Sequence, residues 1–230
     1  MYENIKVIAF DADDTLWINE TYFREAEELF GQLMSAYETL NKAKQELFKT
    51  QIGNLHLYGY GIKGFVLAMV ECATKLSNDK VPAETISKII EIGKDMFQKP
   101  VILLDDIQKV LEELSAKYRL VVATKGDLFD QERKLEKSGL LKYFHHVEVM
   151  SDKKEKDYKK LIGHLDIQPN EFLMIGNSLK SDILPLVQLK SNAIHIPFAT
   201  SWEHEHVSSN ELPQSEYLTI NSALELLTIL

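Results

Sequence analysis

The chain has 230 residues, of which 45% are hydrophobic and 27% charged, and its formal net charge is −9. This acidic balance disfavours a general affinity for nucleic acid or anionic membranes, and no apolar run approaches the roughly 20 residues of a bilayer-spanning helix. The single cysteine, Cys72, excludes an internal disulfide and fits a reducing compartment. Because the N-terminus lacks a basic region followed by a long apolar run, we expect a cytoplasmic protein.

The first expected element is a strand over residues 5–10, which are apolar except for Lys6. Its lack of polar alternation suits a central parallel strand that is covered on both faces. Asp11, Asp13 and Asp14 follow this strand directly. Asp13 and Asp14 could serve only as turn residues. Carboxylates at the exit of a buried strand also predict a functional site, and we favour this interpretation.

Helical spacing replaces the strand pattern from Glu20 to about residue 78, where apolar residues recur every three or four positions. Pro82 begins a further helix, and Pro100 ends it. This block contains no strand pattern. We therefore expect residues 18–100 to form an all-helical domain inserted into the rest of the chain.

A break rich in glycine and tyrosine, Gly53 to Gly61, lies inside this helical block. One interpretation is a flexible connection between two helices. The other is a loop that selects a substrate, and the side chains that we expect to face it are His56, Tyr58, Tyr60 and Lys63.

Strands and helices alternate after Pro100, which predicts an α/β fold with a Rossmann-like parallel sheet and helices on both faces. We expect residues 1–17 and 101–230 to form this core. The expected strands cover residues 120–123, 146–150, 172–175, 193–196 and 218–220. The expected helices begin after Asp105 or Asp106, cover residues 128–138, 158–165 and 183–189, and close the chain after a cap at Asn221.

Polar residues stand at the ends of three of these strands: Asp11 and Asp13, Thr124 and Lys125, and Gly176 with Asn177. Parallel sheets bind ligands beyond the carboxyl ends of their strands, so these residues should converge. If Asp182 joins Asp11 and Asp13, two carboxylates about 4 Å apart repel by about 4 kcal/mol at an effective dielectric near 20. Such repulsion raises a pKa or attracts a cation. Hard oxygen ligands without a Cys/His cluster favour Mg²⁺ over zinc.

An anion can bind on the other side of this site. Thr124 offers a hydroxyl, and the backbone N–H groups of Lys125 and Gly126 stand at a strand-to-helix turn, where phosphates bind. A lysine from the run that begins at Lys153 could neutralise phosphate oxygens. The simpler interpretations are a β-branched strand residue for Thr124, a solvated helix face for the lysines and a helix N-cap for Asp182.

Four ordered motifs resemble those of the haloacid dehalogenase (HAD) superfamily. They are Asp11-x-Asp13-x-Thr15, Thr124 at a strand end, a later lysine, and the run from Gly176 to Asp182. The resemblance covers essentially the whole chain, and the helical insert is similar to the cap of one HAD subgroup. It implies a Mg²⁺-dependent phosphatase that hydrolyses a phosphate ester of a small metabolite through an aspartyl-phosphate.

The resemblance also implies a role for each motif residue. Asp11 is the nucleophile and Asp13 the proton shuttle, and Mg²⁺ is held by Asp11, the backbone carbonyl of Asp13 and Asp182. Thr124 and the N–H of Lys125 hold the phosphate. Lys153 is the expected lysine of the third motif, with Lys154 and Lys156 as competitors.

Two residues refine this interpretation. The dehalogenases of the superfamily lack an acid at the position of Asp13, so its presence favours phosphate esters. Asn177 stands where the phosphatases usually have Asp, which predicts weaker Mg²⁺ affinity, with Asn177 orienting a metal-bound water. A phosphosugar, a phosphoglycolate-like acid and a nucleotide all fit as substrates. The alternatives are a phosphomutase and a non-catalytic regulatory protein, and either a monomer or a homodimer is compatible with the sequence.

Overall fold

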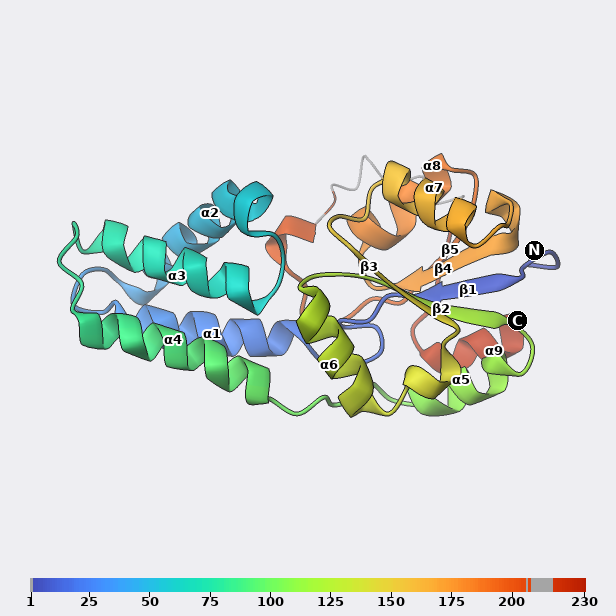
Figure 1. Ribbon diagram of the computed structural model, residues 1–230, viewed down its shortest axis with the longest axis horizontal. Helices are drawn as coiled ribbons and strands as arrows, with labels where there is room; N and C mark the ends of the chain where they lie inside the picture. Colours follow the sequence, from blue (N-terminus) through green and yellow to red (C-terminus); the bar gives the residue numbers. More distant parts are fainter. Residues whose placement is uncertain (1, 206, 208–216) are drawn as a thin grey trace. The chain divides into compact units, whose positions relative to one another are not determined.

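The computed structural model describes residues 2–205, 207 and 217–230 (Figure 1). The chain divides into two compact units. The α/β unit comprises residues 1–18, 101–125 and 131–230, and the helical unit comprises residues 19–100 and 126–130. Across the described residues, none of the helices combines the length and hydropathy that a membrane crossing requires.

The α/β unit is built on a parallel sheet, in which the described residues form six strands in the order β3-β2-β1-β4-β5-β6. This arrangement confirms the predicted Rossmann-like sheet. The strand that precedes Asp11 lies at its centre, paired with β2 and β4. The strands are β1 (Val7–Phe10), β2 (Arg119–Lys125), β3 (His146–Met150), β4 (Phe172–Gly176), β5 (Asn192–His195) and β6 (Leu218–Thr219).

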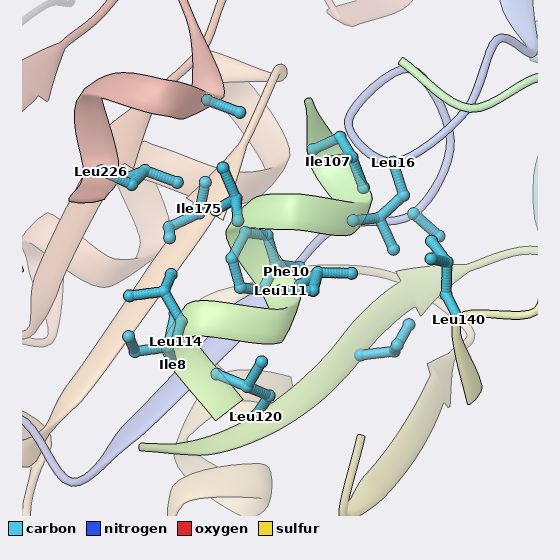
Figure 2. Close-up of a cluster of buried hydrophobic side chains, with 14 of the residues drawn as sticks. Ile8, Phe10, Leu16, Ile107, Leu111, Leu114, Leu120, Leu140, Ile175 and Leu226 are labelled. Carbon is cyan, nitrogen blue, oxygen red and sulfur yellow. The ribbon is translucent and has the colours of Figure 1, made fainter. Parts of the chain in front are cut away.

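Helices cover both faces of this sheet, because both faces are apolar. Successive strand residues point to opposite sides, so Ile8 and Phe10 enter one core and Val7 and Ala9 the other. Figure 2 shows the first core, in which Phe10 lies among Ile8, Leu111, Leu114 and Ile175. The helices on that face are α5 (Ile107–Ser115) and α9 (Leu226–Ile229), and those on the other face are α7 (Glu155–His164) and α8 (Leu184–Gln188).

Several strand bounds differ from the sequence-based expectation by one or two residues, and three helix starts in the α/β unit differ for identifiable reasons. The helix expected from residue 158 begins at Glu155, because the Asp157 carboxylate accepts the N–H of Lys154 and caps its first turn. The helix expected over 183–189 is a π-helical turn, Leu179–Ile183, followed by α8. A 3-10 turn, Ala223–Glu225, precedes the closing helix α9, and Ser222 rather than Asn221 caps this turn, since the Ser222 hydroxyl accepts the N–H of Leu224.

The helical unit has its own core. Its four long helices each contribute apolar residues at helical spacing, among them Phe30, Leu47, Phe65 and Ile89. Cys72 lies in the same core. The helices are α1 (Glu20–Leu33), α2 (Leu40–Tyr58), α3 (Ile62–Leu76) and α4 (Ala83–Gln98).

The expected break from Gly53 to Gly61 was wrong in its extent. Helix α2 continues through Gly53 to Tyr58, and only Gly59 to Gly61 form the turn into α3. Glycine inside a helix costs about 1 kcal/mol relative to alanine, but the contacts of α2 with α3 outweigh this cost. Among them, Asn54 and Tyr58 both donate hydrogen bonds to Glu71.

Candidate active site

The centre of the candidate site is a buried lysine between two carboxylates. Lys153 Nζ lies 2.5 Å from Asp11 Oδ1 and 2.7 Å from Asp182 Oδ1. All three residues are at least nine-tenths buried. Asp11 follows β1, Lys153 follows β3 and Asp182 follows β4, so the long lysine side chain spans the intervening β2. The carboxyl ends of the strands bring these residues together.

Burial and charge work against each other in this cluster. Burial raises the pKa of Asp11 to about 7, a rise that Lys153 opposes and Asp182 reinforces. Burial alone would lower the pKa of Lys153, but the two carboxylates outweigh it and raise that pKa. Lys153 therefore stays charged, and this single ammonium group faces two buried carboxyl groups, so ionisation of Asp11 adds negative charge to a buried place.

A π-helical turn places Asp182 in the cluster. The Asp182 N–H donates to the Ser178 carbonyl at 2.8 Å, and Asp182 Oδ2 accepts the Ser178 N–H at 3.0 Å. Gly176 is required beneath it, because a Cβ at that position would lie 2.3 Å from Asp182 Oδ2. Such turns are rare and often found at functional sites.

The structure separates the three candidate lysines. Lys153 is 3% exposed and contacts both carboxylates. Lys154 and Lys156 are exposed, and Lys154 pairs with Asp152. Only Lys153 of the three lies in the cluster.

Asp13 lies beside this cluster in the loop after β1, and three side chains hold its carboxylate. Oδ1 accepts the Trp17 indole N–H at 2.7 Å and pairs with Lys134 at 2.5 Å, and Oδ2 accepts from Gln131 at 2.8 Å. Gln131 and Lys134 were not predicted from the sequence. The feature that could have indicated them is their three-residue spacing, which puts both on one face of the helix expected after Thr124.

Thr124 and Lys125 stand at the end of β2, as predicted, but their side chains diverge. Thr124 is buried, and its hydroxyl lies 3.2 Å from Gln131 Nε2. Lys125 Nζ donates to Ser181 at 2.9 Å and pairs with Glu205 at 2.5 Å. The Lys125 ammonium group therefore already has an anionic partner, and the phosphate-binding role of its backbone N–H stays a prediction.

Glu205 is a third residue that the sequence did not indicate. Burial would raise its pKa, but Lys125 and hydrogen bonds from Ser178 and Ser181 lower that pKa to about 2. The carboxylate thus anchors the segment 203–205 to the turn that carries Asp182. It lies in a loop without periodicity, so no sequence pattern predicts its partner.

Asn177 faces the loop that follows β1. Its side-chain oxygen accepts the Thr15 hydroxyl at 3.2 Å, and its backbone oxygen lies 3.0 Å from His195 Nε2. Burial lowers the pKa of His195, so the ring is neutral near pH 7 and donates this hydrogen bond. The Asn177 amide, which follows β4, therefore contacts the loop after β1 through Thr15.

The donor set fits a hard divalent cation. Within residues 2–205, 207 and 217–230, no three His, Cys, Asp or Glu side chains converge as ligands. Mg²⁺ needs only one or two carboxylates, because water and substrate phosphate complete its shell. Asp11 and Asp182 offer such oxygens, and their excess negative charge favours a cation.

The candidates for substrate selection all lie in the helical unit. His56 and Tyr58 stand in the last turn of α2, Tyr60 in the following turn, and Lys63 in the first turn of α3. Lys63 pairs with Asp127 at 2.9 Å. The role of these four residues stays a prediction.

Comparison with known proteins gives the family. The model of a family described as haloacid dehalogenase-like hydrolase matches residues 5–189. A haloacid dehalogenase-like family hydrolase from Xanthomonas campestris is 33% identical, covers 98% of this chain and 90% of its own, and superposes with a TM-score of 0.87. The chain belongs to the haloacid dehalogenase-like hydrolase family, as the motifs predict.

More distant relatives extend this finding. The HAD-hydrolase YfnB from Bacillus subtilis, described as bound to magnesium, shares the fold with a TM-score of 0.66 and 18% identity over 99% of each chain. The N-acylneuraminate-9-phosphatase of Mus musculus is 33% identical over 88 residues, which are 36% of this chain and 36% of that protein. The matched segment therefore spans about a third of this curated relative.

Proposed function

We propose that this protein is a Mg²⁺-dependent phosphatase that hydrolyses a phosphate ester of a small metabolite. The observation that carries the proposal is the buried Asp11–Lys153–Asp182 cluster, with Asp13 and Thr124 at neighbouring strand ends. The phosphatases among its relatives support the same reaction class.

Asp11 performs the first step. Its carboxylate oxygen attacks phosphorus, the bond between phosphorus and the leaving oxygen breaks, and Asp13 gives a proton to that oxygen. The products are the alcohol and an aspartyl-phosphate. Lys153 holds the nucleophile in place and stabilises the charge on the phosphoryl oxygens.

Asp13 acts as the general base in the second step. Its carboxylate, now ionised, takes a proton from water while the water oxygen attacks phosphorus. The bond between phosphorus and the Asp11 oxygen breaks. Inorganic phosphate leaves, and both carboxyl groups return to their starting states.

The remaining residues bind and orient. The Thr124 hydroxyl and the Lys125 N–H hold the phosphate, and Asp11, Asp182 and the Asp13 carbonyl would hold Mg²⁺. When bound, Mg²⁺ stabilises negative charge on the transferring phosphoryl group. By its similarity to the family's caps, we assign substrate selection to the helical unit, with His56, Tyr58, Tyr60 and Lys63 as candidates.

A screen of phosphorylated metabolites tests this function. Phosphate release should require Mg²⁺, and Asp11→Asn should lower it by at least about a thousandfold. Asp105→Asn, an exposed aspartate in the same unit, is the matched control and should keep wild-type rates. Full activity of Asp11→Asn would refute the mechanism. An isomerised sugar phosphate without phosphate release would identify a phosphomutase instead.

A further inference from the structure

Three side chains contact the Asp13 carboxylate and fix its orientation. Lys134 and Gln131 reach it from one face of α6 (Leu128–Ser138), and Trp17 reaches it from its own loop. Lys134 is 8% exposed and Gln131 is 4% exposed. A buried ammonium group and a buried amide on one carboxylate leave that carboxylate with a fixed orientation.

The orientation of the Gln131 amide follows from its neighbours. Gln131 Nε2 lies 2.8 Å from Asp13 Oδ2, 3.2 Å from Thr124 Oγ1 and 2.9 Å from the Lys125 carbonyl oxygen. A flipped amide would place its own oxygen 2.9 Å from the Lys125 carbonyl oxygen, which cannot donate a hydrogen bond. Gln131 is therefore a donor that joins the end of β2 to the loop after β1.

The two oxygens of Asp13 have different surroundings. Oδ1 contacts both Lys134 and Trp17, whereas Oδ2 contacts only Gln131 among the described residues. Gln131 also contacts Thr124, the residue assigned to phosphate binding. Oδ2 is thus the oxygen on the phosphate side and the one available for proton transfer.

We propose that Lys134 and Gln131 are positioning residues that hold Asp13 for proton transfer, and that Gln131 sets its distance from Thr124. This inference rests on the proposed phosphatase function. Lys134 balances the charge that Asp13 acquires after it gives its proton to the leaving oxygen. Gln131 directs Oδ2 toward the ester.

Two phosphate esters with different leaving groups distinguish this positioning role from a merely structural one. An alkoxide must be protonated as it leaves, whereas p-nitrophenolate leaves without a proton. General acid catalysis contributes about 10² to 10⁴-fold where it is needed. Misplacing Asp13 should therefore lower kcat/KM for an alkyl phosphate far more than for p-nitrophenyl phosphate, since kcat/KM reports the steps through release of the leaving group.

The experiment compares both esters in Lys134→Met, Gln131→Ala and wild-type protein with saturating Mg²⁺. We expect the alkyl-to-aryl ratio of kcat/KM to fall by at least about tenfold in each variant. Lys134→Arg, which keeps the charge, should recover part of the ratio. Lys137→Met removes an exposed lysine one turn along the same helix and should keep the wild-type ratio.

Equal losses on the two esters, or no loss on either, would overturn the inference and leave the phosphatase function standing. Wild-type protein that hydrolyses neither ester, nor any phosphorylated metabolite in the screen, would overturn both. Thermal melts show whether each variant folds. If Lys134→Met does not fold, the ratios of Gln131→Ala and Lys134→Arg decide.

Discussion

The Lys153 ammonium group contacts the Asp11 carboxylate at 2.5 Å, although 142 residues separate the two in sequence. Asp182 shares the same lysine. One buried ammonium group cannot balance the charge of two buried carboxylates. Repulsion between the carboxylates therefore lowers the stability of the folded protein, and a bound cation would offset it. The first two predictions follow from this imbalance.

Asp11→Asn should stabilise the metal-free protein at alkaline pH. Because the pKa of Asp11 is raised to about 7 from 3.8, its ionised form is less stable in the folded chain than in the unfolded chain. Its contribution to the free energy of unfolding is fully present below pH 4 and is lost as pH rises through 7. Denaturant unfolding at pH 8 with EDTA should show a gain on the order of 2 to 4 kcal/mol for Asp11→Asn over wild type. A less stable Asp11→Asn would contradict the imbalance.

Lys153→Met should lower the free energy of unfolding. It leaves two buried carboxylates without a counterion, and breaking a buried ion pair on one side costs about 3 to 5 kcal/mol. Activity should fall at least about a hundredfold, because Lys153 contacts Asp11, the proposed nucleophile, and is proposed to stabilise the charge on the phosphoryl oxygens. Lys154→Met, at the exposed neighbour, is the control. The double variant Asp11→Asn/Lys153→Met should be more stable than Lys153→Met alone. A double variant that is less stable than Lys153→Met would contradict this account.

Asn177→Asp should strengthen Mg²⁺ binding. The side chain already contacts the loop after β1, where its oxygen accepts from Thr15, and Asp keeps that acceptor while adding a negative charge. Calorimetric titration with Mg²⁺ and the half-saturation of activity should both shift to lower concentration. Asn170→Asp, at an exposed asparagine in the same unit, is a matched control. Unchanged affinity would show that Asn177 does not act on the metal.

Cys72 should be inert until the helical unit opens. Burial raises the pKa of its thiol to about 11, and its side chain lies in the core of that unit. A thiol reagent such as dithionitrobenzoate should therefore react slowly near pH 8 in the native protein and rapidly in denaturant. Labelling at the rate of a free thiol would show that this core is open.

The central sheet was predictable because its strands are apolar runs buried on both faces. Val7 to Phe10 and Phe172 to Ile175 carry no polar residue, so their length and flanking residues identify them as parallel strands. Once those strands are placed, the positions of Asp11, Thr124 and Asp182 at one edge follow from topology. The chain order of the motifs then indicates the family.

The residues that sequence analysis missed are polar residues whose burial depends on tertiary contacts. Gln131 and Lys134 belong to a helix whose charged sequence predicts exposure to solvent, but they are buried and both contact Asp13. Glu205 stands in a loop with no periodicity. The continuation of α2 through Gly53 was missed for a related reason, since packing against α3 outweighs local propensity there.

Gly176→Ala should remove activity through Asp182. A methyl group at this position would lie 2.3 Å from Asp182 Oδ2 and 2.6 Å from its Cβ, and the π-helical turn cannot move without breaking the bonds to Ser178. We expect a loss of about 1 to 3 kcal/mol in the free energy of unfolding, as for other overpacked sites, and a weaker Mg²⁺ response. Gly163→Ala in α7 is the matched control, because nothing lies within 4 Å of its added Cβ. That variant should keep full activity and gain up to about 1 kcal/mol, since alanine is the better helix former. Equal behaviour of the two variants in melting and Mg²⁺-titration experiments would show that the close approach of Gly176 to Asp182 has no part in the site.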